Sequence, residues 1–179
     1  MTSVHQTAKI NPSLVTQHHN DYMTPKYAWD NIKHLIGSKY KVIYESAYGD
    51  GNSGKYLKEI FPNKTIIHKN SDYFKREILE YGIEISNPPF SLSKEWLTEA
   101  KARGKPFMFI LPTSKLGTQY FRGLFSEQGI QIIIPRKRIH FTKLVNGVMP
   151  ENWKNACCFD CFYYTWKMDL PQDIIWLNN

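Results

Sequence analysis

The chain has 179 residues, of which 42% are hydrophobic and 22% are charged. These values are typical of one folded globular domain and exclude wholesale disorder. No apolar run approaches the roughly eighteen residues that would cross a bilayer, and the first twenty residues lack the apolar core of a signal peptide. We therefore expect an intracellular protein of the cytoplasm or nucleus, neither secreted nor bound to a membrane.

The positive charge is concentrated in one part of the sequence. The whole chain carries a net charge of +7, yet residues 100–150 hold nine lysine or arginine residues against the single acid Glu127, a surplus of eight. Such a stretch is typical of a surface that binds a polyanion, although a solubilising face has the same composition. Charge alone leaves both interpretations open.

The predicted elements alternate short helices with short strands. Residues 1–20 are polar without a period, and we expect a flexible arm there, followed by a single domain at 21–179. A helix is predicted from Pro25, which suits a first turn after Thr24, to Gly37. Further helices are predicted at 54–61, 96–103 and 118–125, and strands at 41–44, 65–68, 82–85, 106–112, 131–134, 138–142 and 156–165.

This alternation predicts an α/β fold with a parallel sheet and helices on both faces. The last two predicted strands, 138–142 and 156–165, are joined by a loop. We expect them to add an antiparallel C-terminal edge to the sheet.

A glycine-rich turn follows the first strand, with Glu45 at its start and Gly49 and Gly51 within it. In open α/β sheets, ligands bind beyond the carboxyl ends of the strands, and glycine lets the backbone approach a ligand closely. Residues 49–54 also match the G-x-G-x-x-G fingerprint of NAD enzymes. An NAD enzyme would also need an acidic residue about twenty positions after the glycines. Residues 68–70, at that distance, are His, Lys and Asn, and none of them is acidic.

The second unusual stretch is Asn87-Pro88-Pro89-Phe90, directly after the third predicted strand. The prolines fix the backbone and remove two N–H donors, which leaves a rigid bay of acceptors: the Asn87 side-chain oxygen and the Pro88 carbonyl. Such a bay suits a planar substrate with an exocyclic NH2 group, which two acceptors can hold while the aromatic ring stacks on it. Fixing both hydrogens also favours a pyramidal nitrogen with its lone pair free to attack. The alternative is an ordinary proline-stiffened turn.

These stretches resemble known motifs. Asn87 to Phe90 resembles the D/N/S-P-P-Y/F/W motif of amino-methyltransferases, and Glu45 to Gly51 resembles their S-adenosylmethionine motif. Asp21 to Pro25 is similar to the D-x-W/Y-x-T-P segment of phage-type N6-adenine DNA methyltransferases, and Arg138 to Phe141 to a late R-I-x-F strand of that group. Compact methyltransferases of large DNA viruses are the most similar in overall pattern.

The resemblance implies S-adenosylmethionine as the cofactor, the N6 amine of adenine as the acceptor, and a Rossmann-like methyltransferase sheet. It implies that the target base leaves the DNA duplex. Asn87, Pro88, Pro89 and Phe90 would form the catalytic bay. The implied cofactor-binding residues are Tyr22, Thr24, Pro25, Glu45, Gly49, Gly51, Asn70 and Asp72.

The resemblance also implies DNA as the partner. Residues predicted to contact DNA are Arg136, Lys137, Arg138, His140, Phe141 and Lys143, with the loop 142–155 and the arm 1–20 as the expected sequence readers. The family usually carries an acid after the second strand, where this chain has Asn70. Only fifteen residues separate Ile67 from Ile83, so we expect a compact sheet that lacks one strand.

Several alternatives stay open at this stage. The substrate could be adenine in RNA or a glutamine side chain, or the chain could be an inactive nucleic-acid-binding subunit, and a homodimer is compatible with the sequence. Cys157, Cys158 and Cys161 are too few for a disulfide framework and, without further ligands, are better explained as core residues than as a zinc site. We expect Tyr163, Tyr164 and Trp166 to be core residues.

Overall fold

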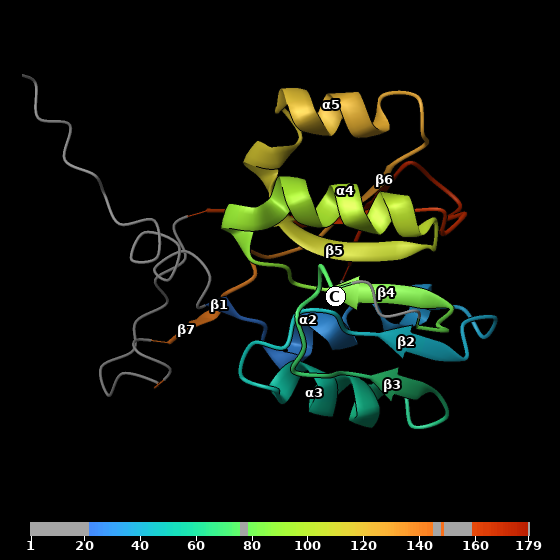
Figure 1. Cartoon of the computed structure of the whole chain (residues 1–179), viewed down its shortest axis with the longest axis vertical. Coiled ribbons are helices and arrows are strands. Elements are labelled where there is room, and N and C mark those ends of the chain that lie inside the picture. Colours follow the sequence, from blue (N-terminus) through green and yellow to red (C-terminus); the bar gives the residue numbers. More distant parts are fainter. Residues whose placement is uncertain (1–21, 76–78, 145–147, 149–158, 179) are drawn as a thin grey trace, which may run out of the picture.

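The described part of the chain is built around one central sheet (Figure 1). It is seen in a computed structural model that describes residues 22–75, 79–144, 148 and 159–178. The predicted arm, Cys157, Cys158 and most of the predicted sequence-reading loop lie outside the described residues. The strands are β1 (Tyr22–Met23), β2 (Val42–Tyr44), β3 (Thr65–Ile67), β4 (Ile83–Ser86), β5 (Phe107–Pro112), β6 (Gln131–Ile134), β7 (Thr142–Lys143), β8 (Cys161–Trp166) and β9 (Ile174–Trp176). The helices are α2 (Lys26–Asp30), α3 (Asn52–Ile60), α4 (Ser93–Arg103) and α5 (Gln119–Phe125), with short 3-10 helices η1 (Lys33–Leu35), η2 (Phe90–Leu92) and η3 (Thr113–Lys115).

The central sheet has seven strands in the order β3-β2-β4-β5-β8-β6-β9. The first four run parallel, β8 runs antiparallel to both of its neighbours, and β9 is parallel to β6. Strands β1 and β7 form a separate antiparallel pair, which we call the β1–β7 ribbon. The predicted α/β class with a mainly parallel sheet is confirmed.

The position of the antiparallel strand corrects the sequence-based prediction of an antiparallel edge. Strand β8 lies inside the sheet, between β5 and β6, and the edge is β9, which was not predicted. Burial explains the inner position, because Tyr163 and Tyr164 on β8 are both fully buried. The strand predicted at 138–142 is also wrong: only Thr142 of that range is in a strand, and it belongs to the ribbon.

The opposite edge of the sheet confirms the expected loss of a strand. Strand β3 is the edge and pairs only with β2, while the next strand in the chain, β4, lies on the other side of β2. Of the connecting residues 68–82, those that the structure describes form no strand. The described part of this connection therefore adds no strand between the edge and the middle of the sheet.

Helices cover both faces, as two consecutive tyrosines of β8 demonstrate. The Tyr163 hydroxyl donates a hydrogen bond to the Ala28 carbonyl of α2 at 2.7 Å. The Tyr164 ring contacts Phe121 of α5, with centroids 5.4 Å apart. Because successive side chains of a strand point to opposite faces, α2 and α5 lie on opposite sides of the sheet.

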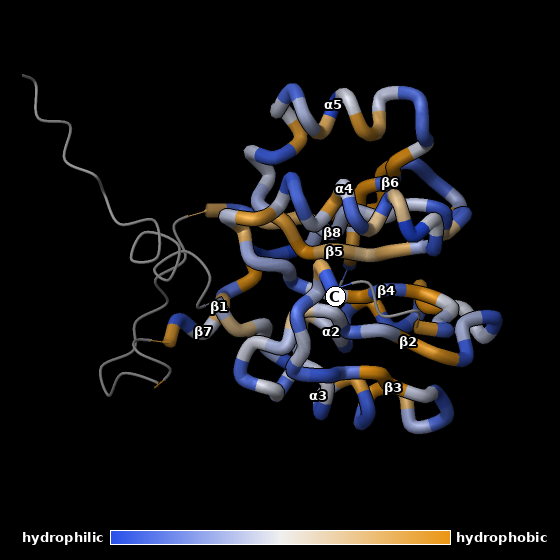
Figure 2. The backbone as a smooth tube through the Cα atoms, viewed as in Figure 1, coloured by the Kyte–Doolittle hydropathy of each residue, from blue (hydrophilic) through white to orange (hydrophobic). Residues whose placement is uncertain are grey.

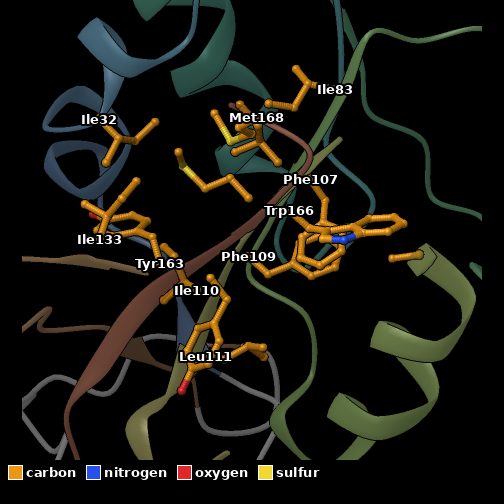
Figure 3. Packing of buried hydrophobic residues seen from close by; sticks show 14 of the residues in the cluster. Ile32, Ile83, Phe107, Phe109, Ile110, Leu111, Ile133, Tyr163, Trp166 and Met168 are labelled. Atoms are coloured by element: carbon orange, nitrogen blue, oxygen red, sulfur yellow. The ribbon is translucent and has the colours of Figure 1, made fainter. Parts of the chain in front are cut away.

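The hydrophobic core follows β5 and β8. All six residues of β5 are buried. Figure 2 shows hydrophobic colouring along β5 and other strands of the sheet. On one face Phe107 stacks on Phe109 with centroids 4.5 Å apart and lies against Trp166, as Figure 3 shows. On the other face Ile110 is paired with Tyr163. Full burial of such side chains stabilises the sheet by about 1.5 to 3 kcal/mol each, so the central strands form a rigid support.

Candidate functional site

The two motifs singled out in the sequence follow neighbouring strands. Strands β2 and β4 are parallel partners, with Tyr44 opposite Glu84. Both strands therefore end at the same edge of the sheet, and the glycine-rich turn lies beside the segment that begins at Asn87. A cavity lies at this edge, lined by Tyr22, Met23, Thr24, Glu45, Ser46, Ala47, Tyr48, Gly49, Asp50, Ser53, Ser71, Asn87, Pro89 and Trp96.

Glu45 organises the floor of this cavity. Its side chain is 1% exposed, and its Oε1 accepts hydrogen bonds from the Ser86 hydroxyl at 2.6 Å and the Ala47 N–H at 3.1 Å. Its Oε2 accepts from the Ser53 hydroxyl at the start of α3. Burial raises the pKa of Glu45 to about 7, although these hydrogen bonds oppose the rise. Glu45 thus ties together β2, α3 and β4.

The turn itself depends on glycine. Gly49 and Gly51 have φ of 55° and 80°, which L side chains rarely adopt. A Cβ at Gly49 would lie 3.0 Å from the Met23 sulfur of β1, so the turn and β1 approach closely. Within the turn, the Tyr48 ring stacks on His68, with centroids 4.9 Å apart. The result is a tight backbone curve with an aromatic residue, Tyr48, on the cavity wall.

Asn87 presents an unusual acceptor. Its Nδ2 donates a hydrogen bond to the Tyr22 carbonyl at 2.9 Å. Its Oδ1 is buried and accepts no hydrogen bond from the residues that the structure describes. A buried acceptor without a partner is unfavourable by about 1 to 3 kcal/mol. This atom therefore points to a ligand that brings its own N–H or O–H donor.

An aromatic cluster surrounds Phe90, the last residue of the motif. The Phe90 ring is 8% exposed and nearly parallel to the Tyr22 ring, with centroids 6.0 Å apart and an angle of 24°. Phe141 and Phe159 contact the Phe90 ring edge-on, at 5.9 and 5.4 Å. Residues far apart in the sequence thus enclose the ring beside Asn87.

Most of the predicted site residues come together at this edge. Tyr22, Thr24, Glu45, Gly49, Asn87 and Pro89 line the cavity, Pro25 and Gly51 border it in the chain, and Pro88 is buried between Asn87 and Pro89. Asn70 and Asp72 are exposed and are not part of the lining, to which Ser71 between them contributes. The Asp72 carboxylate instead accepts a hydrogen bond from the Phe74 N–H at 3.0 Å.

Sequence reasoning missed other lining residues. Ser46, Ala47, Tyr48, Asp50 and Ser53 lie within or directly after the glycine-rich turn, so their position in that segment was a usable signal. Met23 and Trp96 had no such signal. The Trp96 indole donates a hydrogen bond to the Ser46 hydroxyl at 3.3 Å, a contact fifty residues apart in sequence.

The predicted DNA-contacting residues occupy different environments. Arg138 is exposed and makes two hydrogen bonds with the Asp160 carboxylate, at 2.7 and 3.1 Å. Arg136, Lys137 and His140 are exposed, whereas Phe141 is 1% exposed and belongs to the aromatic cluster. The Lys143 ammonium lies 5.6 Å from the centroid of the Tyr22 ring.

Part of the positive stretch at 100–150 is paired with acids from outside that stretch. Arg103 pairs with Glu99 and donates a hydrogen bond to the Tyr73 carbonyl at 2.6 Å. Lys105 pairs with Glu80 at 3.8 Å. The surface charge is therefore smaller than the count of eight along the sequence.

Within the described residues, neither a metal site nor a membrane-spanning helix has a candidate. There, no group of three or more His, Cys, Asp or Glu side chains could hold a metal ion, and Cys161 is buried and forms no disulfide with another described residue. No helix in this part of the chain is long and apolar enough to cross a membrane.

The overall architecture matches solved structures of methyltransferases. A protein from Listeria monocytogenes assigned to the class I S-adenosylmethionine-dependent methyltransferases is similar over 88% of this chain and 65% of its own length, with a TM-score of 0.52 and 14% identity. Two further structures match less well. They are a dimethyladenosine transferase from Plasmodium falciparum (TM-score 0.46, 11% identity, 81% of this chain and 62% of that chain) and a predicted O-methyltransferase from Agrobacterium tumefaciens (TM-score 0.45, 11% identity, 82% and 83%).

The chain spans less than two thirds of the length of the first two of these proteins. No protein-family model matches the sequence, and no curated protein does. At this level of identity the likeness is one of fold. The described chain has the Rossmann-like fold of class I S-adenosylmethionine-dependent methyltransferases.

Proposed function

We propose that this protein is an S-adenosylmethionine-dependent methyltransferase that modifies the N6 amine of adenine in DNA. The observation that carries the proposal is the buried Asn87 Oδ1, which lacks a donor among the described residues and lies beside the cavity at the edge of the sheet. The fold makes this edge the expected ligand site, because ligands of open α/β sheets bind beyond the carboxyl ends of the strands.

The cavity has features that fit the cofactor. Gly49 and Gly51 hold a turn that side chains would obstruct, and the Tyr48 ring lies at its wall. Tyr48, Gly49 and Asp50 would contact the cofactor on one side, and Ser71 and other lining residues on the other. When bound, S-adenosylmethionine supplies an electrophilic methyl group. Glu45 would act on the cofactor indirectly, because its two carboxylate oxygens already accept hydrogen bonds that fix the turn.

The segment after β4 would hold the acceptor amine. Asn87 Oδ1 and the Pro88 carbonyl can accept the two hydrogens of an exocyclic NH2, which directs the nitrogen lone pair away from both acceptors. Such preorganised acceptors stabilise the positive charge that develops on the nitrogen during methyl transfer. The hydrogen bond from Asn87 Nδ2 to the Tyr22 carbonyl orients the side chain and leaves Oδ1 without a partner among the described residues.

Adenine is the base that this bay favours. Phe90 supplies an aromatic face next to the two acceptors, and a purine offers the larger surface for stacking. A base inside a duplex cannot reach a bay enclosed by four aromatic rings, so the target would have to leave the helix. Arg136 and Lys137, which are exposed, and Lys143, which is half-buried, would contact the phosphates.

Two measurements test this proposal together. Calorimetric titration with S-adenosylhomocysteine tests the cofactor site, and we expect one molecule to bind per chain. Incubation with S-adenosylmethionine labelled in the methyl group, together with DNA, RNA or a glutamine-containing protein, tests the acceptor. We expect label in DNA.

Each other result has a distinct meaning. Label in RNA would keep the chemistry and change the nucleic acid, and label in protein would remove the nucleic acid altogether. Binding of S-adenosylhomocysteine with no transfer to any polymer would indicate an inactive binding subunit. Absence of binding would refute the proposed cofactor.

A further inference from the structure

The rings of Tyr22 and Phe90 face each other beside the unpaired Asn87 oxygen. Their centroids are 6.0 Å apart and their planes differ by 24°, whereas Phe141 and Phe159 contact Phe90 at 79° and 86°. Tyr22 is thus the one nearly parallel partner of Phe90 among these rings. An aromatic base that stacks on Phe90 would have to meet Tyr22.

The spacing of these two rings is shorter than a base between them requires. Carbon atoms in van der Waals contact are about 3.5 Å apart, so a planar base between two parallel rings needs roughly 7 Å between them. The centroids are 6.0 Å apart and the ring planes can be no further apart than that, so the deficit is at least about 1 Å. An outward movement of Tyr22 by at least this amount would create a slot of the right width.

The backbone pairing of the β1–β7 ribbon, which carries Tyr22, is short. Its pairing consists of two residue pairs, Tyr22 with Lys143 and Met23 with Thr142. Tyr22 also accepts the hydrogen bond from Asn87 Nδ2 at its carbonyl, and its ring contacts Phe90, Phe141, Phe159 and the Lys143 ammonium. Because the ribbon pairs over two residues and β5 with β8 over six, the ribbon is expected to open at a lower free energy than the central sheet. The same movement would uncover Asn87 Oδ1.

We propose that Tyr22 is the second wall of the target-base pocket, opposite Phe90, and that the β1–β7 ribbon closes this pocket until a base is inserted. The proposal rests on the proposed function, because it presupposes a base held by Asn87. It also assigns to Tyr22 a role different from the cofactor contact that the sequence resemblance implies. In this arrangement Met23, the next residue on β1, faces Gly49 on the cofactor side.

The test compares binding with and without the target base. After the methylated adenine and its flanking sequence are identified, two duplexes are made that differ only at that position, one with adenine and one with an abasic site. Affinities are measured by fluorescence anisotropy with saturating S-adenosylhomocysteine. The proteins are the wild type, Tyr22→Leu, Tyr22→Phe and, as a control, Trp176→Leu, which removes a ring that is 68% exposed on β9.

We expect Tyr22→Leu to bind the adenine duplex roughly ten-fold more weakly, a loss within the range of base–aromatic stacking. Its affinity for the abasic duplex should stay within two-fold of the wild type, because that duplex has no base to stack. Tyr22→Phe keeps the ring and should resemble the wild type with both duplexes, as should Trp176→Leu.

Equal effects of Tyr22→Leu on both duplexes, or no effect on either, would overturn the proposal. Weaker binding of S-adenosylhomocysteine by Tyr22→Leu, without a difference between the duplexes, would assign Tyr22 to the cofactor instead. Failure of the proposed function would be visible earlier and separately, as the absence of any methylated adenine with the wild type.

Discussion

Replacing Glu84 by glutamine is expected to change how the stability of the protein depends on pH. Glu84 lies in the middle of β4 and is 1% exposed, and its Oε1 has no hydrogen-bond partner among the described residues. Burial raises the pKa of this carboxyl to about 7, while a hydrogen bond from Ser46 and the nearby Arg103 guanidinium oppose the rise. The folded protein therefore keeps Glu84 protonated in a range where the unfolded chain has already lost the proton.

The sign and size of the change in stability with pH follow from that difference in protonation. Between the ordinary value of 4.5 and about 7, the folded state binds more protons than the unfolded state, so stability falls as the pH rises through this window. One group loses at most about 1.4 kcal/mol for each pH unit, which gives about 2 to 3 kcal/mol between pH 5 and pH 8. Glutamine cannot ionise, so Glu84→Gln avoids this loss.

The assay is urea unfolding at pH 5 and pH 8. Glu84→Gln should match the wild type at pH 5 and be more stable by up to about 3 kcal/mol at pH 8. Glu127→Gln changes an exposed carboxylate and should leave the difference between the two pH values as in the wild type. Burial of Glu45 contributes a loss of the same sign to each of these proteins, and because the Glu84 charge adds to the raised pKa of Glu45, Glu84→Gln changes both losses in the same direction. A Glu84→Gln effect of the same size at both pH values would refute this reasoning.

The remaining predictions concern the site and its surface. Asn87→Ala should lower kcat by roughly 10²- to 10³-fold with S-adenosylhomocysteine affinity within two-fold, while Asn87→Asp keeps an acceptor oxygen and most of the activity; an unchanged kcat in the alanine variant would remove this residue from the mechanism. Gly54→Ala would place a Cβ 2.0 Å from a ring nitrogen of the histidine that follows β3, and should destabilise the protein by about 1 to 3 kcal/mol in urea unfolding. Gly117→Ala, whose Cβ would meet nothing within 4 Å, is the matched control, and equal effects would contradict the packing. Arg136→Gln should reduce the slope of log affinity for DNA against log salt by about one, and Arg138→Gln by less, because a carboxylate already holds that guanidinium; an unaltered slope in both would place the phosphates elsewhere.

Local sequence patterns were sufficient to predict the core of the fold and the two turns. The run at 41–44, the apolar strand at 106–112 and the glycine-rich turn each depend on neighbouring residues, so their signals are contained in short segments. Asn87 to Phe90 was recognisable for the same reason. The parallel sheet then placed both turns at one edge, because consecutive parallel strands end on the same side.

Features that depend on distant contacts could not be predicted in the same way. The hydrogen bond from Asn87 to Tyr22 joins residues sixty-five positions apart, and no local pattern indicates that their side chains meet. The insertion of β8 between β5 and β6 is decided by burial on both faces. Charge along the sequence was also misleading in part, because Arg138 pairs with Asp160 outside the positive stretch.

The most direct measurement of the proposed chemistry is the identity of the methylated nucleoside. DNA is incubated with the wild-type protein and S-adenosylmethionine labelled in the methyl group, digested to nucleosides and analysed by mass spectrometry. A bay of acceptors at Asn87 and Pro88 predicts labelled N6-methyl-2′-deoxyadenosine. Label on a ring carbon, as in 5-methyl-2′-deoxycytidine, would contradict it, because no exocyclic amine would have taken part.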